Sequence, residues 1–326
     1  MTSKRGFDTK LEALRSLRAS NDGAFVQAQL GKTLKEHNNY LVGRAATLAA
    51  ELRSERLIPD LLAAFDRFMQ DPAKSDPQCL AKSAIAEALR KLEDRNPDVY
   101  VRGIAHFQFE PAFGGHADSA AGLRATCALA LAESHLPDLD ILTFLADALA
   151  DPEKEVRIAS AIAINNLGRL EGALLLRLKA LSGDSESEVV GHCFASLLNM
   201  GASDAVPFVG RFLESSDGDV RLEAVSALAQ CREPEALKLL EELWEQPLLS
   251  IEVRRALLIN LGASPLAESA EFLLQVVRSE SPTLAVTAIS ALATSRFRLQ
   301  IASRVAQVVG GRGEPELTRA FDESFS

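Results

Sequence analysis

The chain has 326 residues and a formal net charge of −10, because 45 acidic side chains outnumber 35 basic ones. Hydrophobic residues make up 47% of the chain but aromatic residues only 6%, which favours many Ala- and Leu-rich helices over a large β-sandwich. The excess of acid also disfavours contact with a phosphate backbone, so we expect no nucleic-acid partner.

The first part of the chain differs in charge from the rest. Residues 1–58 carry 10 basic and 6 acidic side chains, a balance of +4 that leaves −14 for the remainder. We expect residues 1–37 to form N-terminal capping helices, whose basic side chains are either a solvated face or a contact for an acidic partner or a membrane surface. Charges are too frequent here for an export signal, and no uncharged run reaches the roughly 18 residues of a membrane span. These features predict a cytoplasmic chain with no membrane span.

A short pattern recurs at a nearly fixed interval. It starts with an aliphatic residue, here called the anchor, and small or aliphatic residues follow at positions +4, +5 and +8, the spacing of one helix face. The clearest anchors lie 31 or 33 residues apart and are Leu123, Val156, Val189, Val220, Val253 and Leu284. Leu80 and Val42 continue the series upstream with insertions. A period of this kind indicates stacked structural units.

Each unit is expected to be a pair of antiparallel helices. The anchor helix ends near a glycine that can cap it, as at Gly168, Gly201 and Gly262, and a second amphipathic helix follows. We therefore predict an all-α fold, an α-α superhelix of about eight helical pairs over residues 38–310, followed by a C-terminal cap or tail at 311–326.

Charged residues flank the anchors at regular positions. Acids stand at −1 or −3 and include Glu153, Glu155, Glu186, Glu188, Asp217, Asp219 and Glu252. Carboxylates there can cap free amide groups and favour the positive end of the helix dipole, so we interpret them as helix starts rather than as a site for a basic partner. Arg157, Arg221 and Arg254 at +1 are expected to pair with acids in adjacent turns.

The order of residues within one repeat resembles that of the HEAT family. It consists of an acid, Val-Arg, two variable residues, a pair of Ala-type residues, Ala-Leu and a capping Gly. The pattern is similar to the short HEAT-like units of phycobilisome lyase subunits and of many bacterial repeat proteins. It covers about residues 38–310 and is most specific from Leu123 to Leu292. The resemblance implies an α-α superhelix and does not imply one activity, since function lies in sites rather than in folds.

A polar stripe at +3 and +10 is the first candidate binding surface. It includes Glu133, Asn166, His192, Asn199, Glu223 and Gln230. In stacked arrays we expect the first helix of each pair on the convex side and the second on the concave side, the usual binding surface. The stripe is either a groove for a peptide or partner helix or the solvated face that any amphipathic helix needs.

One insertion, residues 107–118, interrupts the repeat and is the second candidate. Its candidate contact residues are Phe107, Phe109, Glu110, Phe113, His116 and Asp118. Pro111 and the Gly114-Gly115 pair break a helix, which predicts a loop, where binding residues are common. In one hypothesis the three rings anchor a partner while the polar side chains orient polar contacts. In the other, the rings plug the end of the hydrophobic core.

No motif in the chain points to catalysis. His106, Glu110, His116 and Asp118 are metal-ligand types, but Pro111 separates His106 and Glu110 from a shared helix face. No HExxH motif, phosphate-binding loop or nucleophile elbow is present, nor are the His-Glu pairs that HEAT-like deoxyhypusine hydroxylases use for iron. We expect no catalytic residue, no metal and no cofactor.

The leading prediction is a non-enzymatic protein-binding scaffold or adaptor that uses the concave face and the 107–118 insertion, with another protein or a peptide as partner. The alternative, implied by the resemblance to phycobilisome lyases, is a chaperone-like lyase subunit that assists attachment of a chromophore or prosthetic group. A third interpretation is an enzyme using the His and Glu side chains of the insertion. Cys127 and Cys193 at +4 are interpreted as small core residues.

Overall fold

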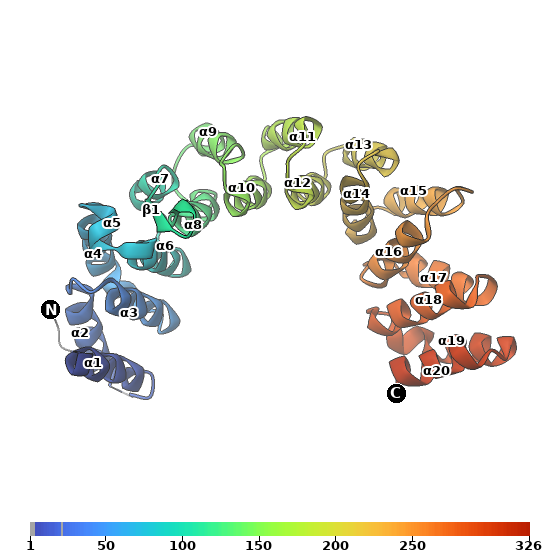
Figure 1. The fold of residues 1–326 in the computed structure, drawn as a ribbon, viewed down its shortest axis with the longest axis horizontal. Helices are drawn as coiled ribbons and strands as arrows, with labels where there is room; N and C mark the ends of the chain where they lie inside the picture. The colour runs from blue at the N-terminus through green and yellow to red at the C-terminus, as the bar shows by residue number, and fades with distance from the viewer. Residues whose placement is uncertain (1–3, 21) are drawn as a thin grey trace. The chain divides into compact units, whose positions relative to one another are not determined.

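The computed structural model describes residues 4–20 and 22–326, which are mostly helical and divide into two compact units, Met1–Arg169 and Leu170–Ser326 (Figure 1). The elements of the first unit are α1 (Lys4–Leu17), α2 (Gly23–Leu34), α3 (Asn39–Glu51), η1 (Glu55–Leu57), α4 (Ile58–Met69), α5 (Pro72–Ser75), η2 (Pro77–Cys79), α6 (Leu80–Lys91), α7 (Asp98–Ile104), β1 (Phe109–Ala112), β2 (Gly115–Asp118), α8 (Ala121–Leu131), α9 (Asp138–Ala148) and α10 (Lys154–Leu167). Those of the second are α11 (Gly172–Ser182), α12 (Ser187–Asn199), α13 (Ala205–Gly210), η3 (Arg211–Glu214), α14 (Gly218–Gln230), α15 (Pro234–Trp244), α16 (Ile251–Gly262), α17 (Ala267–Ser279), α18 (Pro282–Thr294), α19 (Arg298–Arg312) and α20 (Pro315–Phe325).

The helices of each unit form two rows. In the first unit α3, α6, α8 and α10 pack one against the next, with α2, α4, α7 and α9 behind them. In the second unit α12, α14, α16, α18 and α20 form the equivalent row, backed by α11, α13, α15, α17 and α19. Figure 1 shows the first-mentioned row of each unit on the inner side of that unit's own bend. The prediction of an all-α array of stacked helix pairs is confirmed.

The structure corrects the phase of the repeat. The anchor helices, such as α10, α12 and α14, form the inner row (Figure 1), whereas the sequence predicts the first helix of each pair on the convex side. Most anchor helices contact the preceding helix more than the following one, as α10 does with α9 and α18 with α17, which makes the anchor helix the second of its pair; α16, which contacts α17 more than α15, is an exception. The physical reason is that small buried residues after the anchor, such as Ala161 and Ala163, let inner helices lie close together.

The anchors are mainly core residues. Leu123, Val156 and Val189 are fully buried. Leu80 is an exception, because its side chain is 42% exposed while Ala81 is fully buried. Ile85, Ala86 and Leu89, also buried, then stand at +4, +5 and +8 from Ala81. The anchor of that repeat is Ala81, and the prediction of Leu80 is wrong by one residue.

The two ends of the repeat region also form helices. Residues 1–37 contain α1 and α2. The predicted cap or tail at 311–326 contains α20, which packs on α18 as a further helix of the inner row. Among residues 4–20 and 22–326, no helix has the length and apolar character needed to cross a membrane.

Inner helices begin after a recurring hydrogen-bond acceptor that lies five residues before the anchor. Asp118, Asp151 and Asp184 each accept the backbone N–H of the residue at −3 at 2.9 Å, and Ser215 does so at 3.2 Å. Asp76, five residues before Ala81, accepts two N–H groups of the first turn of α6 at 2.9 Å. These side chains satisfy N–H groups that helix geometry leaves without partners.

The capping interpretation of the acids at −3 holds for Asp217. Its carboxylate accepts the N–H groups of Asp219 at 3.0 Å and Val220 at 3.2 Å. Glu153 and Glu186 occupy the N-cap position without a side-chain cap hydrogen bond. At these two helix starts Asp151 and Asp184, two residues earlier, accept the backbone N–H groups of Glu153 and Glu186 themselves.

The basic residues at +1 contact the loop that precedes their own helix. Arg157 donates to the carbonyls of Asp151 and Pro152, both at 2.8 Å. Arg221 donates to the carbonyl of Ser215, and Arg254 to that of Gln246 at 3.1 Å. Within the described residues, Arg221 and Arg254 form no ion pair with an acid. The contacts to backbone carbonyls take the place of the predicted pairing.

Glycines at the ends of anchor helices have two different roles. Gly168 and Gly201 have φ of +68° and +67°, the left-handed conformation predicted for caps. Gly262 does not cap α16. A Cβ at that position would lie 2.7 Å from the carbonyl oxygen of Ala291 and 3.1 Å from its Cα, so Gly262 is required for the close approach of α18.

We expect Gly262→Ala to destabilise the protein by about 1–3 kcal/mol, because the added methyl group meets backbone atoms that cannot move without separating two helices. Urea unfolding followed by circular dichroism measures the change. Gly310→Ala is the control, since a Cβ at this position in α19 meets no atom within 4 Å and the change favours helix by about 0.5–1 kcal/mol. Equal effects of the two substitutions would contradict the close-approach role.

Candidate functional site

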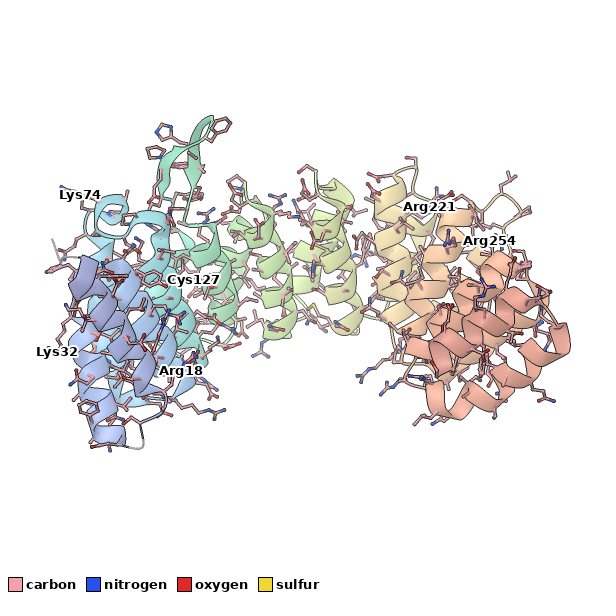
Figure 2. All side chains as sticks on the ribbon, turned by 60° about the horizontal axis from the view of Figure 1, so that its bottom comes forward. Arg18, Lys32, Lys74, Cys127, Arg221 and Arg254 are labelled. Carbon is pink, nitrogen blue, oxygen red and sulfur yellow. The ribbon has the colours of Figure 1, made fainter. Side chains whose placement is uncertain are left out.

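The insertion at 107–118 is a β-hairpin, not the loop that the sequence predicts. β1 pairs antiparallel with β2, with Phe109 opposite Asp118 and Ala112 opposite Gly115. Gly114 forms the turn with φ of +89°, a conformation that glycine adopts without strain. Figure 2 shows the hairpin projecting beyond the ends of the neighbouring helices of its unit.

Pro111 is compatible with this hairpin because of its place in the register. The N–H of Ser119 donates to the carbonyl of Gln108 at 2.9 Å, so the antiparallel alternation makes the pair of Pro111 and His116 a non-hydrogen-bonded one. Pro111 therefore occupies an outward position, where no donor to β2 is needed. A proline on the outer edge also prevents further strand pairing there.

The three phenylalanine rings of the insertion lie in solvent. Phe107 is 45% exposed, Phe109 63% and Phe113, at the turn, fully exposed. The rings of Phe107 and Phe109 stack with centroids 6.3 Å apart and an interplanar angle of 10°. His116 is exposed on β2. The hypothesis that these rings plug the end of the core is therefore wrong, because their own stacking and the hairpin geometry hold them outside it.

A buried arginine fixes the base of the hairpin. Arg124 of α8 is fully buried and donates to Asp118 of β2, to the carbonyl of His106 at 3.1 Å, and to both carboxylate oxygens of Asp151 at 2.7 and 2.9 Å. Its guanidinium group also lies 4.0 Å from the ring centroid of Phe107. One side chain thus joins both ends of the hairpin to the start of the next inner helix.

The charges at this base are stabilised by their surroundings. Burial alone would raise the pKa of Asp118, but hydrogen bonds from the N–H groups of Gln108 and Ala120 and from Arg124 outweigh it and hold the pKa below its ordinary value. Burial would likewise lower the pKa of Arg124, yet its bonds to Asp151 and Asp118 raise it. Both groups are therefore ionised and paired, and Asp118 supports the hairpin from within.

The opposite face of the hairpin is tied to the segment before α6. Both oxygens of Glu110 accept the N–H of Gln78 at 2.9 Å, and Gln108 donates from Nε2 to the carbonyl of Asp76 at 2.9 Å. Gln78 and Cys79 have positive φ values of +61° and +52°, a conformation that costs about 1–3 kcal/mol per non-glycine residue. Glu110 therefore stabilises a strained turn beneath the hairpin.

The residues of the polar stripe are distributed over both units. In the first unit, Glu133 follows α8 and lies 3.8 Å from Arg90, and Asn166 is exposed near the end of α10. In the second, His192 and Asn199 lie on α12, and Glu223 and Gln230 on the neighbouring α14. The residues at +10 are exposed and those at +3 are half-buried. The stripe therefore forms two local surfaces, one in each unit.

Glu223 is the stripe residue with the most unusual environment. Its side chain lies over Gly191 of α12, where an added Cβ would collide with the Glu223 carboxylate. Burial, together with the negative charges of Glu188 and Asp219, raises the pKa of Glu223.

Potential metal ligands and nucleophiles form no cluster in the described residues. Residues 4–20 and 22–326 contain no group of three or more His, Cys, Asp and Glu side chains placed to hold a metal ion. Cys127 and Cys193 are fully buried, as their interpretation as core residues requires. Burial raises the pKa of Cys193 to about 12 and also raises that of Cys127, which disfavours the reactive thiolate.

One exposed surface was not predicted. In the second unit taken alone, a line of leucines at helical spacing is 57–70% exposed on and beside α11 and consists of Leu170, Leu174, Leu178 and Leu181. Ala173, Leu176 and Ala180 cover the buried face of the same helix. The sequence signal was the number of leucines in this helix, which is larger than its buried face accommodates.

Paired helices in two rows, with one anchored β-hairpin, define this chain as a helical-repeat protein. Residues 174–251 match the family of HEAT repeats, so this segment carries HEAT repeats, and the predicted resemblance to that family is confirmed there. No curated protein sequence matches the chain.

Several solved structures are similar in fold. They include the complex of CpcE and CpcF of phycocyanin lyase from Nostoc sp. (20% identity, 78% of this chain and 92% of that chain covered, TM-score 0.38). Human deoxyhypusine hydroxylase in complex with glycerol is similar at 19% identity, with 79% and 90% covered and a TM-score of 0.30. The Escherichia coli protein YibA is similar at 18% identity, with 87% and 96% covered and a TM-score of 0.44.

Replacing Arg124 by Met is expected to cost about 3–5 kcal/mol of unfolding free energy, because it leaves the carboxylates of Asp118 and Asp151 buried without their cation. Urea unfolding measures the loss. Arg102→Met is the matched control: its pair with Asp66 is partly exposed, so the expected cost is below ~1 kcal/mol. A loss at Arg124 no larger than at Arg102 would show that the buried network does not hold the base of the hairpin.

The substitution Glu223→Gln should raise the melting temperature at pH 7 by about 1–3 °C. Since the pKa of Glu223 is higher in the folded state, its ionised form destabilises the fold at neutral pH and the penalty vanishes as the pH falls below the ordinary value near 4.3. The variant and wild type should therefore melt alike at about pH 4. Asp322→Asn, at an exposed position outside the first turn of α20, serves as the control with no such difference. A pH-independent gain at Glu223 would refute the charge argument.

Proposed function

We propose that this chain is a non-enzymatic scaffold or adaptor that binds another protein, with the 107–118 hairpin as a principal contact element. The observation that carries the proposal is the combination of a firmly anchored base with exposed aromatic rings. Arg124 and Glu110 fix the base, while Phe109 and Phe113 lie in solvent. Exposed apolar groups held in one position are typical of interaction sites.

The energetics favour protein contact at the tip. Covering an exposed phenylalanine contributes about 1.5–3 kcal/mol, and aromatic residues are common among the side chains that dominate interface affinity. Because the strands and their base are already ordered, little conformational entropy is lost on binding. Between Pro111 and Ala117 the hairpin has no Asp, Glu, Lys or Arg, so an apolar partner surface is covered without burying a formal charge.

Other predictions about function stay as predictions. No contact among the described residues bears on the chaperone-like lyase alternative or on an enzyme built from His and Glu of the insertion. The same is true of the expected cytoplasmic location and of the expected lack of a nucleic-acid partner. HEAT repeats support a scaffold in general terms, and the contribution of the polar stripe to binding is part of this proposal.

The double substitution Phe109→Ala and Phe113→Ala should reduce partner binding at least about 30-fold, the equivalent of losing one or two dominant contacts. Quantitative affinity capture from the native host, with wild-type and variant baits compared at equal loading, measures the effect. The matched control is Leu248→Ala with Leu299→Ala, because these residues of the second unit are 97% and 92% exposed. Unchanged melting temperatures confirm folding. Equal recovery of every protein by wild type and the hairpin variant would refute the role of the tip.

A further inference from the structure

A cavity lies at the foot of the hairpin, within the first unit. It has a volume of about 360 Å³ and opens between α7 and the end of α9. Its apolar lining comes mainly from Ile104, Phe107, Phe144, Ala148 and Pro152. Its size lies in the lower part of the roughly 300–1,000 Å³ range of ligand pockets.

The face of the hairpin that carries Phe107 and Phe109 extends from this cavity. Phe107 lines the cavity and its ring stacks on that of Phe109, which belongs to the same face because side chains alternate along a strand. Beneath Phe107 the guanidinium group of Arg124 packs against the ring at 4.0 Å. The cavity and the face formed by Phe107 and Phe109 are together called the foot groove. Its walls are preformed, since one of them is held by the buried network of Arg124.

The charge at the rim of the foot groove has one sign. Asp147 and Asp151 both line the cavity. Asp151 is buried and both its oxygens accept from Arg124. Asp147 is exposed, and no ion pair involving it occurs in the described part of the chain. An accessible carboxylate therefore stands beside an apolar cavity, in a chain whose net charge is −10.

We propose that the foot groove binds a short segment of a partner protein that places an apolar side chain in the cavity and a lysine or arginine beside Asp147. This inference rests on the proposed protein-binding function but uses a surface separate from Phe113 at the tip. The cavity supplies most of the affinity, because a partly exposed ion pair contributes little. Asp147 supplies selectivity, since an acidic neighbour in the partner segment is repelled.

Selection from a displayed library of random twelve-residue peptides on the full chain tests the proposal. We expect enriched sequences to carry an aromatic or aliphatic residue next to Lys or Arg. Their synthetic versions should bind Ala105→Trp about tenfold more weakly than wild type, because Ala105 lines the cavity at an exposed position and indole would fill it. Ala105→Ser is the matched control and should bind as wild type does.

Two further variants separate the contribution of the Asp147 charge from that of the hairpin tip. Asp147→Lys should weaken basic peptides several-fold and leave versions with Gln in place of the basic residue unchanged. Phe113→Ala should have no effect on either. Three results would each overturn the proposal that the foot groove binds a peptide segment. They are failure to enrich any peptide, enrichment of acidic sequences, and peptide affinities that do not change with Ala105→Trp. If peptides instead lose affinity only with Phe113→Ala, the tip binds and the foot groove does not, so the proposed function survives while this inference fails.

Discussion

Buried contacts between a cation just after the anchor and an acid five residues before it hold the beginnings of α6, α8 and α10 in place. Lys82 lies 3.1 Å from Asp76 with both side chains fully buried, Arg124 pairs with Asp118, and Arg157 donates to the backbone of Asp151. Charges in a low-dielectric interior are tolerated only when paired and hydrogen-bonded. The loops before these three helices must therefore keep one conformation, which fixes where each of the three helices begins.

Arg124 extends this arrangement from one repeat to the next, because it binds Asp118 of its own repeat and Asp151 of the following one. Asp118 is a candidate contact residue of the insertion, and its position relative to Leu123 also makes it one of the recurring acceptors. The hairpin thus ends on a residue that the repeat requires anyway, which explains how an insertion of β-structure fits into a helical array.

Helices and their period could be predicted from sequence because amphipathic spacing is a local property. The phase of the pairing could not, since both helices of a pair have an apolar face and only their mutual contacts tell which is inner. Leu80 was chosen over Ala81 because a larger aliphatic residue gives the stronger signal, although burial depends on helix orientation. The spacing from Asp118 to Arg124, repeated from Asp151 to Arg157, was present in the sequence and would have shown that these residues act together.

The residue composition of the 107–118 insertion identified it as a candidate site. Its hairpin conformation and the exposure of its phenylalanine rings were seen only in the structure. Phenylalanine is buried in most proteins, so exposure of Phe109 and Phe113 depends on contacts made elsewhere, by Gln108 and Glu110 with a strained turn. No local pattern specifies those partners, which lie 32 residues earlier in the chain.

The hairpin meets the repeats through its base, where Gln108, Glu110 and Asp118 make hydrogen bonds to neighbouring segments. Residues 111–117, beyond that base, are exposed. The exposed part of the insertion is therefore independent of the repeats. Strands of another length, or another tip sequence, can be attached to the same base without changing how the helices stack.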